Sequence, residues 1–184
     1  MDELMKKVAK LEAIAEIQKL QGKYYRCLDS KLWDELGEVF APKFHTAFSD
    51  GRLVFDHYNG EGGLRQYYEA QMNDSAMISQ HNGHTPEITV ADDLQTAKAK
   101  WYLHDYLIIL GTDWGVRGTA IYDIEYAVVD GEWKITSIGY KRIYEENWSR
   151  KKPGEKHMVT ENMFAPQAEH HGAVTLQGDT QLKK

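Results

Sequence analysis

Apolar and polar residues alternate along residues 95–110, as in a strand whose two faces meet different surroundings. One face is apolar at every position but one: Ala97, Ala99, Trp101, Leu103, Asp105, Leu107 and Ile109. The pattern therefore predicts that Asp105 points into an apolar interior, where a carboxylate needs a partner or a shifted pKa. Such groups concentrate at functional sites, although structural ion pairs carry the same signature.

The N-terminal part of the chain has helical spacing instead. Apolar residues recur at steps of three and four over about residues 2–28, which predicts one long helix with a buried stripe. The stripe comprises Leu4, Val8, Leu11, Ile14, Ile17, Leu20, Tyr24 and Leu28. The first half of this helix is highly charged, so we expect it to project or to pair with another subunit. Shorter helices are predicted over about residues 31–40, ended by Pro42, and over about residues 64–72.

The remaining elements are predicted to be strands. Two short ones, over about residues 43–49 and 52–57, flank Asp50-Gly51, a hairpin signal. Four longer strands are predicted over about residues 77–90, 96–110, 117–129 and 132–144. Long strands joined by short turns form a curved antiparallel sheet. We therefore expect an α+β cone, with the N-terminal helices covering the concave face.

The cone domain is expected to span residues 1–148. After Tyr144 the alternating pattern ends, and residues 149–184 contain Pro153, Pro166, glycines and scattered charges. This composition predicts a tail without regular structure.

Composition narrows the function classes. A formal net charge of −6 argues against broad nucleic-acid binding, and eleven Tyr and five Trp suit a pocket for an apolar molecule. One cysteine, Cys27, excludes an intramolecular disulfide and a cysteine-cluster metal site. No apolar run approaches the ~20 residues that cross a bilayer, and the charged N-terminal helix is unlike a signal peptide. We expect a cytoplasmic protein.

Motifs for metals, nucleotides and activated serines are missing from the sequence. We therefore expect no metal and no cofactor, and chemistry that rests on proton transfer by Tyr, His and Asp. Tyr24 continues the stripe of the first helix, as a core tyrosine or as a hydrogen-bond donor to a cavity. Asp29 ends that helix, in a position to cap the next one. Arg142 lies on the last strand, and if it points inward it needs a carboxylate such as Asp29 or Asp105.

Two histidines on the strand before Asp105 are candidates for an acid–base group. A hairpin centred near residue 93 places His81 opposite Asp105, where Cβ atoms lie about 4.5–5.5 Å apart, so an Asp–His pair is expected. Counting back from Ile88 and Val90 instead puts His84 on the core face. A bulge near Gly83 or Pro86 would exchange the two faces. The pattern alone leaves both histidines open.

The chain resembles the SnoaL-like branch of the nuclear-transport-factor-like superfamily, and within it is most similar to bile acid 7α-dehydratases. The similar segments are GKYYRCLDSKLWDEL (22–36), DGRLVF (50–55), HNGHTPEIT (81–89), WYLHDYLI (101–108), DGEWKI (130–135) and GYKRIYEE (139–146). HxGHTPEI followed by WYLxD and GYxRIYEE is the most specific combination. The resemblance implies a cone fold and a homo-oligomer, either a dimer or a trimer.

The resemblance also implies a site. It places the active-site tyrosine at Tyr24, the catalytic histidine at His81 and its aspartate at Asp105, with Asp29 and Arg142 as a supporting charge pair. The implied reaction is loss of water from a 7α-hydroxy-3-oxo-4-ene bile acid, either free or as its coenzyme A thioester. Alternatives are an isomerase or dehydratase for another steroid or polyketide, and a non-catalytic module that binds a small molecule.

Overall fold

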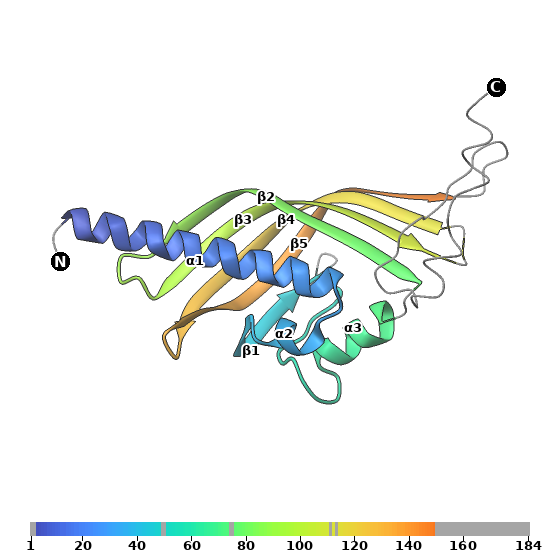
Figure 1. Cartoon of the computed structure of the whole chain (residues 1–184), viewed down its shortest axis with the longest axis horizontal. Coiled ribbons are helices and arrows are strands. Elements are labelled where there is room, and N and C mark those ends of the chain that lie inside the picture. The colour runs from blue at the N-terminus through green and yellow to red at the C-terminus, as the bar shows by residue number, and fades with distance from the viewer. Residues whose placement is uncertain (1–2, 49–50, 74–75, 111, 113, 150–184) are drawn as a thin grey trace, which may run out of the picture.

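The computed structural model describes residues 3–48, 51–73, 76–110, 112 and 114–149. Three helices and five strands follow one another in the order α1 (Glu3–Asp29), α2 (Trp33–Gly37), β1 (Phe40–Ala47), α3 (Leu64–Met72), β2 (Met77–Val90), β3 (Thr96–Ile109), β4 (Trp114–Val129) and β5 (Glu132–Ser149). The long strands β2 to β5 form a curved sheet, and the helices lie on one side of it (Figure 1). The predicted α+β arrangement is confirmed. No described helix is long and apolar enough to cross a membrane.

The sheet is mixed, with the order β1-β5-β4-β3-β2. The strands from β2 to β5 are antiparallel, as predicted, but β1 pairs with β5 in parallel. The prediction of a wholly antiparallel sheet is therefore wrong at this edge. The error arises because a hairpin signal indicates pairing only between segments that are adjacent in the sequence. Phe40 pairs with Ile135, which is far from it along the chain.

The region after α1 also differs from its prediction. The expected helix over residues 31–40 is only five residues long, and Pro42 lies inside β1 instead of ending a helix. An edge strand tolerates proline because one side of its backbone has no strand partner, and the register shifts between Phe40 and His45. Phe48 bridges Leu53 in an antiparallel contact, but residues 52–57 form no longer strand. Asp50 of the predicted hairpin turn lies outside the described residues.

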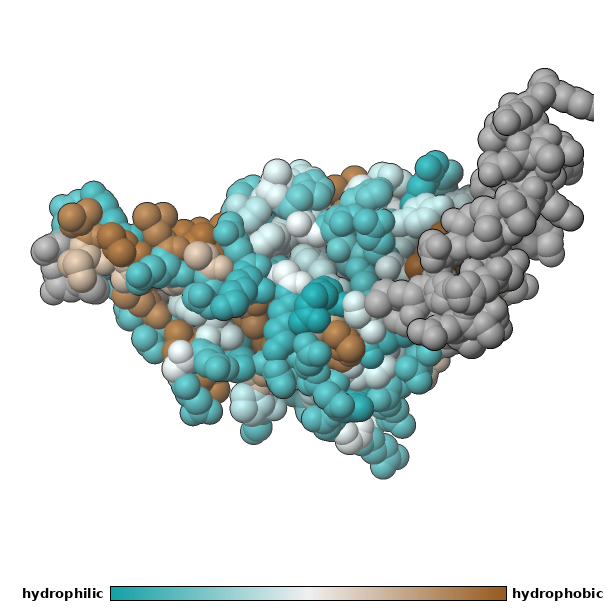
Figure 2. Space-filling view, viewed as in Figure 1, coloured by the Kyte–Doolittle hydropathy of each residue, from teal (hydrophilic) through white to brown (hydrophobic). Residues whose placement is uncertain are grey.

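Only the second half of α1 buries its apolar stripe. Ile17, Tyr24 and Leu28 are inaccessible or nearly so. Leu4 and Leu11 are 69% and 66% exposed, and Figure 2 shows apolar residues gathered on the surface at the N-terminal end of this helix. The helix therefore extends past the sheet before it reaches the core. That its first half pairs with another subunit stays a prediction.

The register between β2 and β3 settles which histidine faces inward. His81 pairs with Asp105, as the hairpin count predicts, and the register shifts between His84 and Glu87. Thr85, in this shift, has a left-handed φ of 45°. The extra residue is the bulge that exchanges the faces, so His81 and Ile88 both lie toward the core. His84 is exposed and stacks on Tyr102.

The last strand, β5, continues to Ser149, five residues beyond the predicted end at Tyr144. Pairing with β4 supports the extension, since Arg117 binds Glu146 at 2.7 Å and the indole of Trp148 covers Gly115. Apart from Ser149, the predicted tail lies outside the described residues.

Candidate active site

A cavity of about 250 Å³ lies between the curved sheet and the helices. Its floor is formed by buried side chains: Tyr24, Tyr68, Leu103, Asp105 and Tyr122. Its rim consists of partly exposed residues, including Met72, Met77 and Tyr140. Four of the five predicted site residues line this cavity, namely Tyr24, His81, Asp105 and Arg142. The fifth, Asp29, contacts His81.

His81 is held by Asp29, which is the last residue of α1. Its ring Nδ1 lies 2.6 Å from Asp29 Oδ1, and its main-chain N–H donates to Asp29 Oδ2 at 2.8 Å. Ser79 also donates its hydroxyl to Oδ1 at 2.9 Å. Because a carboxylate only accepts, Nδ1 carries the proton, and Nε2 is the basic nitrogen of the neutral ring. Nε2 has no hydrogen-bond partner among the described residues, so it is available to a molecule in the cavity.

Asp105 and Arg142 form a second pair. Two guanidinium nitrogens donate to the two carboxylate oxygens, each at 2.7 Å, the bidentate geometry of a strong ion pair. The Asp105 side chain is 3% exposed and that of Arg142 is 23% exposed. Burial lowers the pKa of Arg142, but the hydrogen bonds and charge of Asp105 raise it by more, so that the pKa lies above its ordinary value. Asp105 is thus a buried carboxylate with a satisfied partner.

The structure therefore exchanges the predicted partners. Asp105 was expected to bind His81, and this is wrong, because Asp29 binds His81 instead. For Arg142 the sequence left Asp29 and Asp105 open and the resemblance implied Asp29, whereas the structure has Asp105. Opposed Cα positions do not fix which side chains meet, because Asp29 is within reach of His81 from the end of α1 and Arg142 is within reach of Asp105 from β5. The structure brings the five residues together around one cavity, but not in the pairs that the resemblance implied.

Gly118 makes room for the contact between Arg142 and Asp105. It lies on β4, directly opposite Asp105 on β3 and next to β5. A Cβ atom at this position would lie 3.0 Å from Arg142 Nη1 and 3.3 Å from Asp105 Oδ1. The absent side chain lets the guanidinium cross the intervening strand. Neither Gly118 nor Ser79 was singled out from the sequence, although Ser79 shares the strand face of His81 by its spacing of two residues.

Tyrosine hydroxyls make up the rest of the polar surface. The hydroxyl of Tyr24 lies 3.3 Å from that of Tyr68 on α3, where both are buried. Burial raises the pKa values of Tyr24, Tyr68 and Tyr122 well above the ordinary value for tyrosine. These hydroxyls are neutral donors at any physiological pH. Among the described residues, no group of three or more His, Cys, Asp or Glu side chains is placed to hold a metal ion.

These raised pKa values predict a limit to alkaline stability. An acid whose pKa is higher in the folded state keeps its stabilising effect below its unfolded pKa, near 10 for tyrosine, and loses it as the pH rises beyond. We expect tyrosinate absorbance from Tyr24, Tyr68 and Tyr122 to appear together with the loss of near-ultraviolet circular dichroism, in an alkaline titration followed by both signals. Triple replacement by phenylalanine should remove this part of the absorbance change. Ionisation of the three tyrosines in a protein that keeps its full dichroism would contradict the expectation.

Comparison with known proteins agrees with this architecture. The SnoaL-like domain family matches residues 9–138, and the chain belongs to that family. A hexachlorocyclohexane dehydrochlorinase, LinA-type3 from Novosphingobium barchaimii, has a similar structure with a TM-score of 0.67 at 15% identity, over 83% of this chain and 99% of that chain.

Two further solved structures share the fold. A protein described as a putative scytalone dehydratase, from Novosphingobium aromaticivorans, has a TM-score of 0.68 at 14% identity, over 82% of this chain and 99% of that one. ActVI-ORFA from Streptomyces coelicolor has a TM-score of 0.58 at 14% identity, over 71% and 96%. At these identities the likeness establishes the fold, and it confirms the predicted cone.

Proposed function

We propose that this protein is a lyase that removes water from a cyclic hydroxy ketone by proton transfer at His81. The observation that carries the proposal is the 2.6 Å contact that holds His81 against Asp29, at the wall of a cavity lined by tyrosine and aliphatic side chains. Two structurally similar proteins support the same class of reaction. One is a hexachlorocyclohexane dehydrochlorinase and the other is described as a putative scytalone dehydratase, and both names denote an elimination.

The proposed reaction has two proton transfers. Nε2 of His81 removes a proton from carbon, and the electron pair of that C–H bond moves toward the carbonyl group of the substrate. The C–O bond to the hydroxyl group then breaks as the new C=C bond forms, and His81 gives its proton to the departing oxygen, which leaves as water. Positioned acid–base groups typically accelerate such steps by about 10²–10⁴-fold.

The charges around the cavity suit this sequence. With His81 neutral, Asp29 and Asp105 contribute two negative charges and Arg142 one positive charge, a net charge of −1. Protonation of His81 brings this local sum to zero while the substrate becomes an enolate. Asp29 stabilises the imidazolium, and the buried Asp105–Arg142 pair holds its charges without needing protons from the substrate. The acid–base role therefore falls to His81 and not to Asp105.

We propose that the linked hydroxyls of Tyr24 and Tyr68 act together, one donating its proton to the other, which donates to the substrate carbonyl. Negative charge collects on that oxygen as the proton leaves carbon, and donors aimed at developing charge contribute about 3–4 kcal/mol each in well-organised sites. Their raised pKa values keep both hydroxyls protonated. Of the two, Tyr68 was not singled out from the sequence; it lies on the same α3 helix as Met72.

For the substrate, we propose a 7α-hydroxy-3-oxo-4-ene bile acid, free or as its coenzyme A thioester. Its enone makes the proton at C6 acidic, so that His81 has a suitable target. The support is the resemblance of residues 81–89, 101–108 and 139–146 to bile acid 7α-dehydratases. The cavity of about 250 Å³ is slightly below the ~300–1,000 Å³ usual for small-molecule pockets. A four-ring substrate would therefore place its reacting end inside and the rest along the rim.

The test is direct. Incubation with a 7α-hydroxy-3-oxo-4-ene bile acid should yield the 4,6-dien-3-one, seen as a red-shifted absorbance and as loss of water by mass spectrometry. The 7β-hydroxy epimer is the matched control and should react more slowly. Tight binding of the 7α compound without conversion would replace the proposal with a binding module. Conversion of only a polyketide-like hydroxy ketone would keep the lyase and reject the bile acid.

A further inference from the structure

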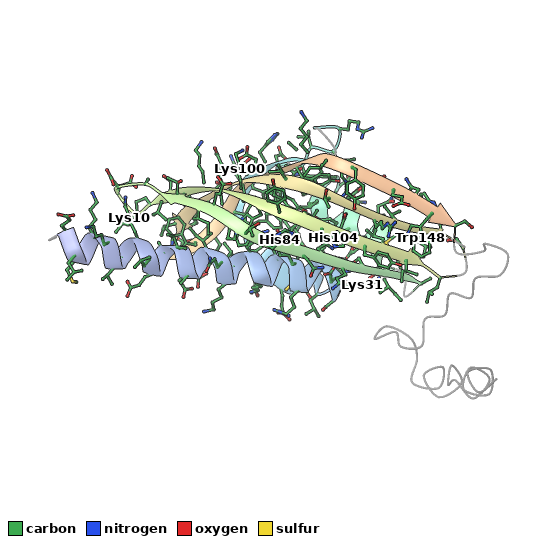
Figure 3. All side chains as sticks on the ribbon, turned by 90° about the horizontal axis from the view of Figure 1, so that it is seen from above. Lys10, Lys31, His84, Lys100, His104 and Trp148 are labelled. Carbon is green, nitrogen blue, oxygen red and sulfur yellow. The ribbon has the colours of Figure 1, made fainter. Side chains whose placement is uncertain are left out.

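Lys31 lies in the short connection between α1 and α2, and its side chain holds the two ends of the α3–β2 connection. Its ammonium donates to the carbonyl oxygen of Met72, the last residue of α3, and to that of Met77, the first residue of β2, the latter at 2.7 Å. Figure 3 shows Lys31 near the end of α1, beside β2. Bonds from an ammonium are stronger than those between neutral groups, so Lys31 fixes the separation of these two carbonyls.

The backbone of Lys31 gives a second observation. Its φ is 56°, in the left-handed region that glycine adopts without strain. A lysine at this position carries conformational strain that a glycine would not. The hydrogen bonds of the Lys31 ammonium therefore offset the conformational strain of its backbone. Glycine is also the matched substitution, because it removes the ammonium and suits the backbone.

The neighbours of Lys31 attach to the same region. Asp29 binds His81 on β2, as described above. Trp33 donates its indole N–H to Asn73 Oδ1 at 3.1 Å and stacks on Tyr68, with ring centroids 5.9 Å apart. Three alternate residues, from the end of α1 to the start of α2, thus contact the base, the cavity rim and the ring of a cavity tyrosine. Within this set, Lys31 is the residue that holds the rim.

Met72 and Met77 are the side chains that Lys31 positions. Both line the cavity and are only partly buried, in contrast to the floor. Methionine side chains are flexible, so the place they occupy depends on where their backbone is held. We infer that Lys31 is a positioning residue that sets the width of the cavity rim and thereby selects for extended, fused-ring substrates. The inference rests on the proposed function, in which such a substrate lies partly along the rim.

A kinetic comparison tests the selection. Lys31→Gly removes the ammonium, and Lys31→Arg keeps a cation with donors. With the 7α-hydroxy-3-oxo-4-ene bile acid, Lys31→Gly should raise KM by about tenfold, a loss of about 1.4 kcal/mol in binding, at unchanged kcat, because the rim along which the outer rings lie is no longer fixed. With a bicyclic hydroxy ketone that the cavity encloses, KM should not change, and Lys31→Arg should restore most of the preference. An equal fall in kcat for both substrates, with KM unchanged, would overturn the inference.

A second measurement needs no substrate. In the full chain labelled with ¹³C-methyl methionine, the signals of Met72 and Met77 are assigned with single Met→Leu variants. Lys31→Gly should shift or broaden both signals, and Lys31→Arg should bring them back toward their original positions. This result separates the two proposals, because it holds even if no hydroxy ketone is converted. Unchanged Met72 and Met77 signals in Lys31→Gly would overturn the role of Lys31, whatever the activity.

Discussion

Replacing His81 by alanine is expected to lower kcat by about 10²–10⁴-fold, the usual contribution of a positioned acid–base group. The variant loses the nitrogen that accepts the proton from carbon and returns it to the leaving hydroxyl. The measurement is the rate of dienone formation at saturating bile acid. His84→Ala is the matched control, because His84 lies three residues away on the same strand but is exposed and stacked on Tyr102. This control should keep full activity.

Asp29→Asn completes the test of the dyad. The amide keeps the shape of the carboxylate but removes the charge that stabilises an imidazolium, and it can donate to Nδ1 and so favour the wrong tautomer. We therefore expect a fall in kcat with little change in KM, since the substrate contacts His81 and not Asp29. Full turnover by both His81→Ala and Asp29→Asn would remove His81 as the base and leave the cavity without the proposed chemistry.

The sequence is informative where a signal is local. The alternation along β3 placed Asp105 inward, and the structure has the same face buried from Ala97 to Asp105. The hairpin count correctly predicted that His81 lies opposite Asp105 in the strand register. A bulge near Pro86 was one of two open possibilities, and it was the correct one. Each of these signals needs only two neighbouring strands and the geometry of a pleated sheet.

Partner choice within the site could not be predicted in this way. Asp29 and His81 are 52 residues apart, and Asp105 and Arg142 are 37 apart. Whether Arg142 is within reach of Asp105 depends on the register of β5 on β4 and on the missing side chain at Gly118. The parallel pairing of β1 with β5 was missed for the same reason. These features arise from long-range packing, which no single segment of the sequence encodes.

The Asp105–Arg142 pair should matter most for stability. Arg142→Met keeps much of the length of the side chain but removes the charge, leaving the carboxylate of a 2% exposed Asp105 without its partner. Removing one member of a buried ion pair typically costs about 3–5 kcal/mol. We expect a loss of this size in the free energy of unfolding, measured by urea denaturation with the slope of the transition held as a check on two-state behaviour.

The double variant Asp105→Leu/Arg142→Met distinguishes two causes of this loss in stability. If the loss comes from an uncompensated charge, then removing the second charge as well should recover much of the stability, because apolar side chains of similar volume often replace a buried pair at little cost. If it comes instead from lost packing around Gly118 and Tyr140, the double variant should be at least as unstable as Arg142→Met. Exposed ion pairs contribute below about 1 kcal/mol. A loss of that size in Arg142→Met would contradict both explanations, the uncompensated charge and the lost packing. It would mean that water reaches Asp105 and that the floor of the cavity is not dry.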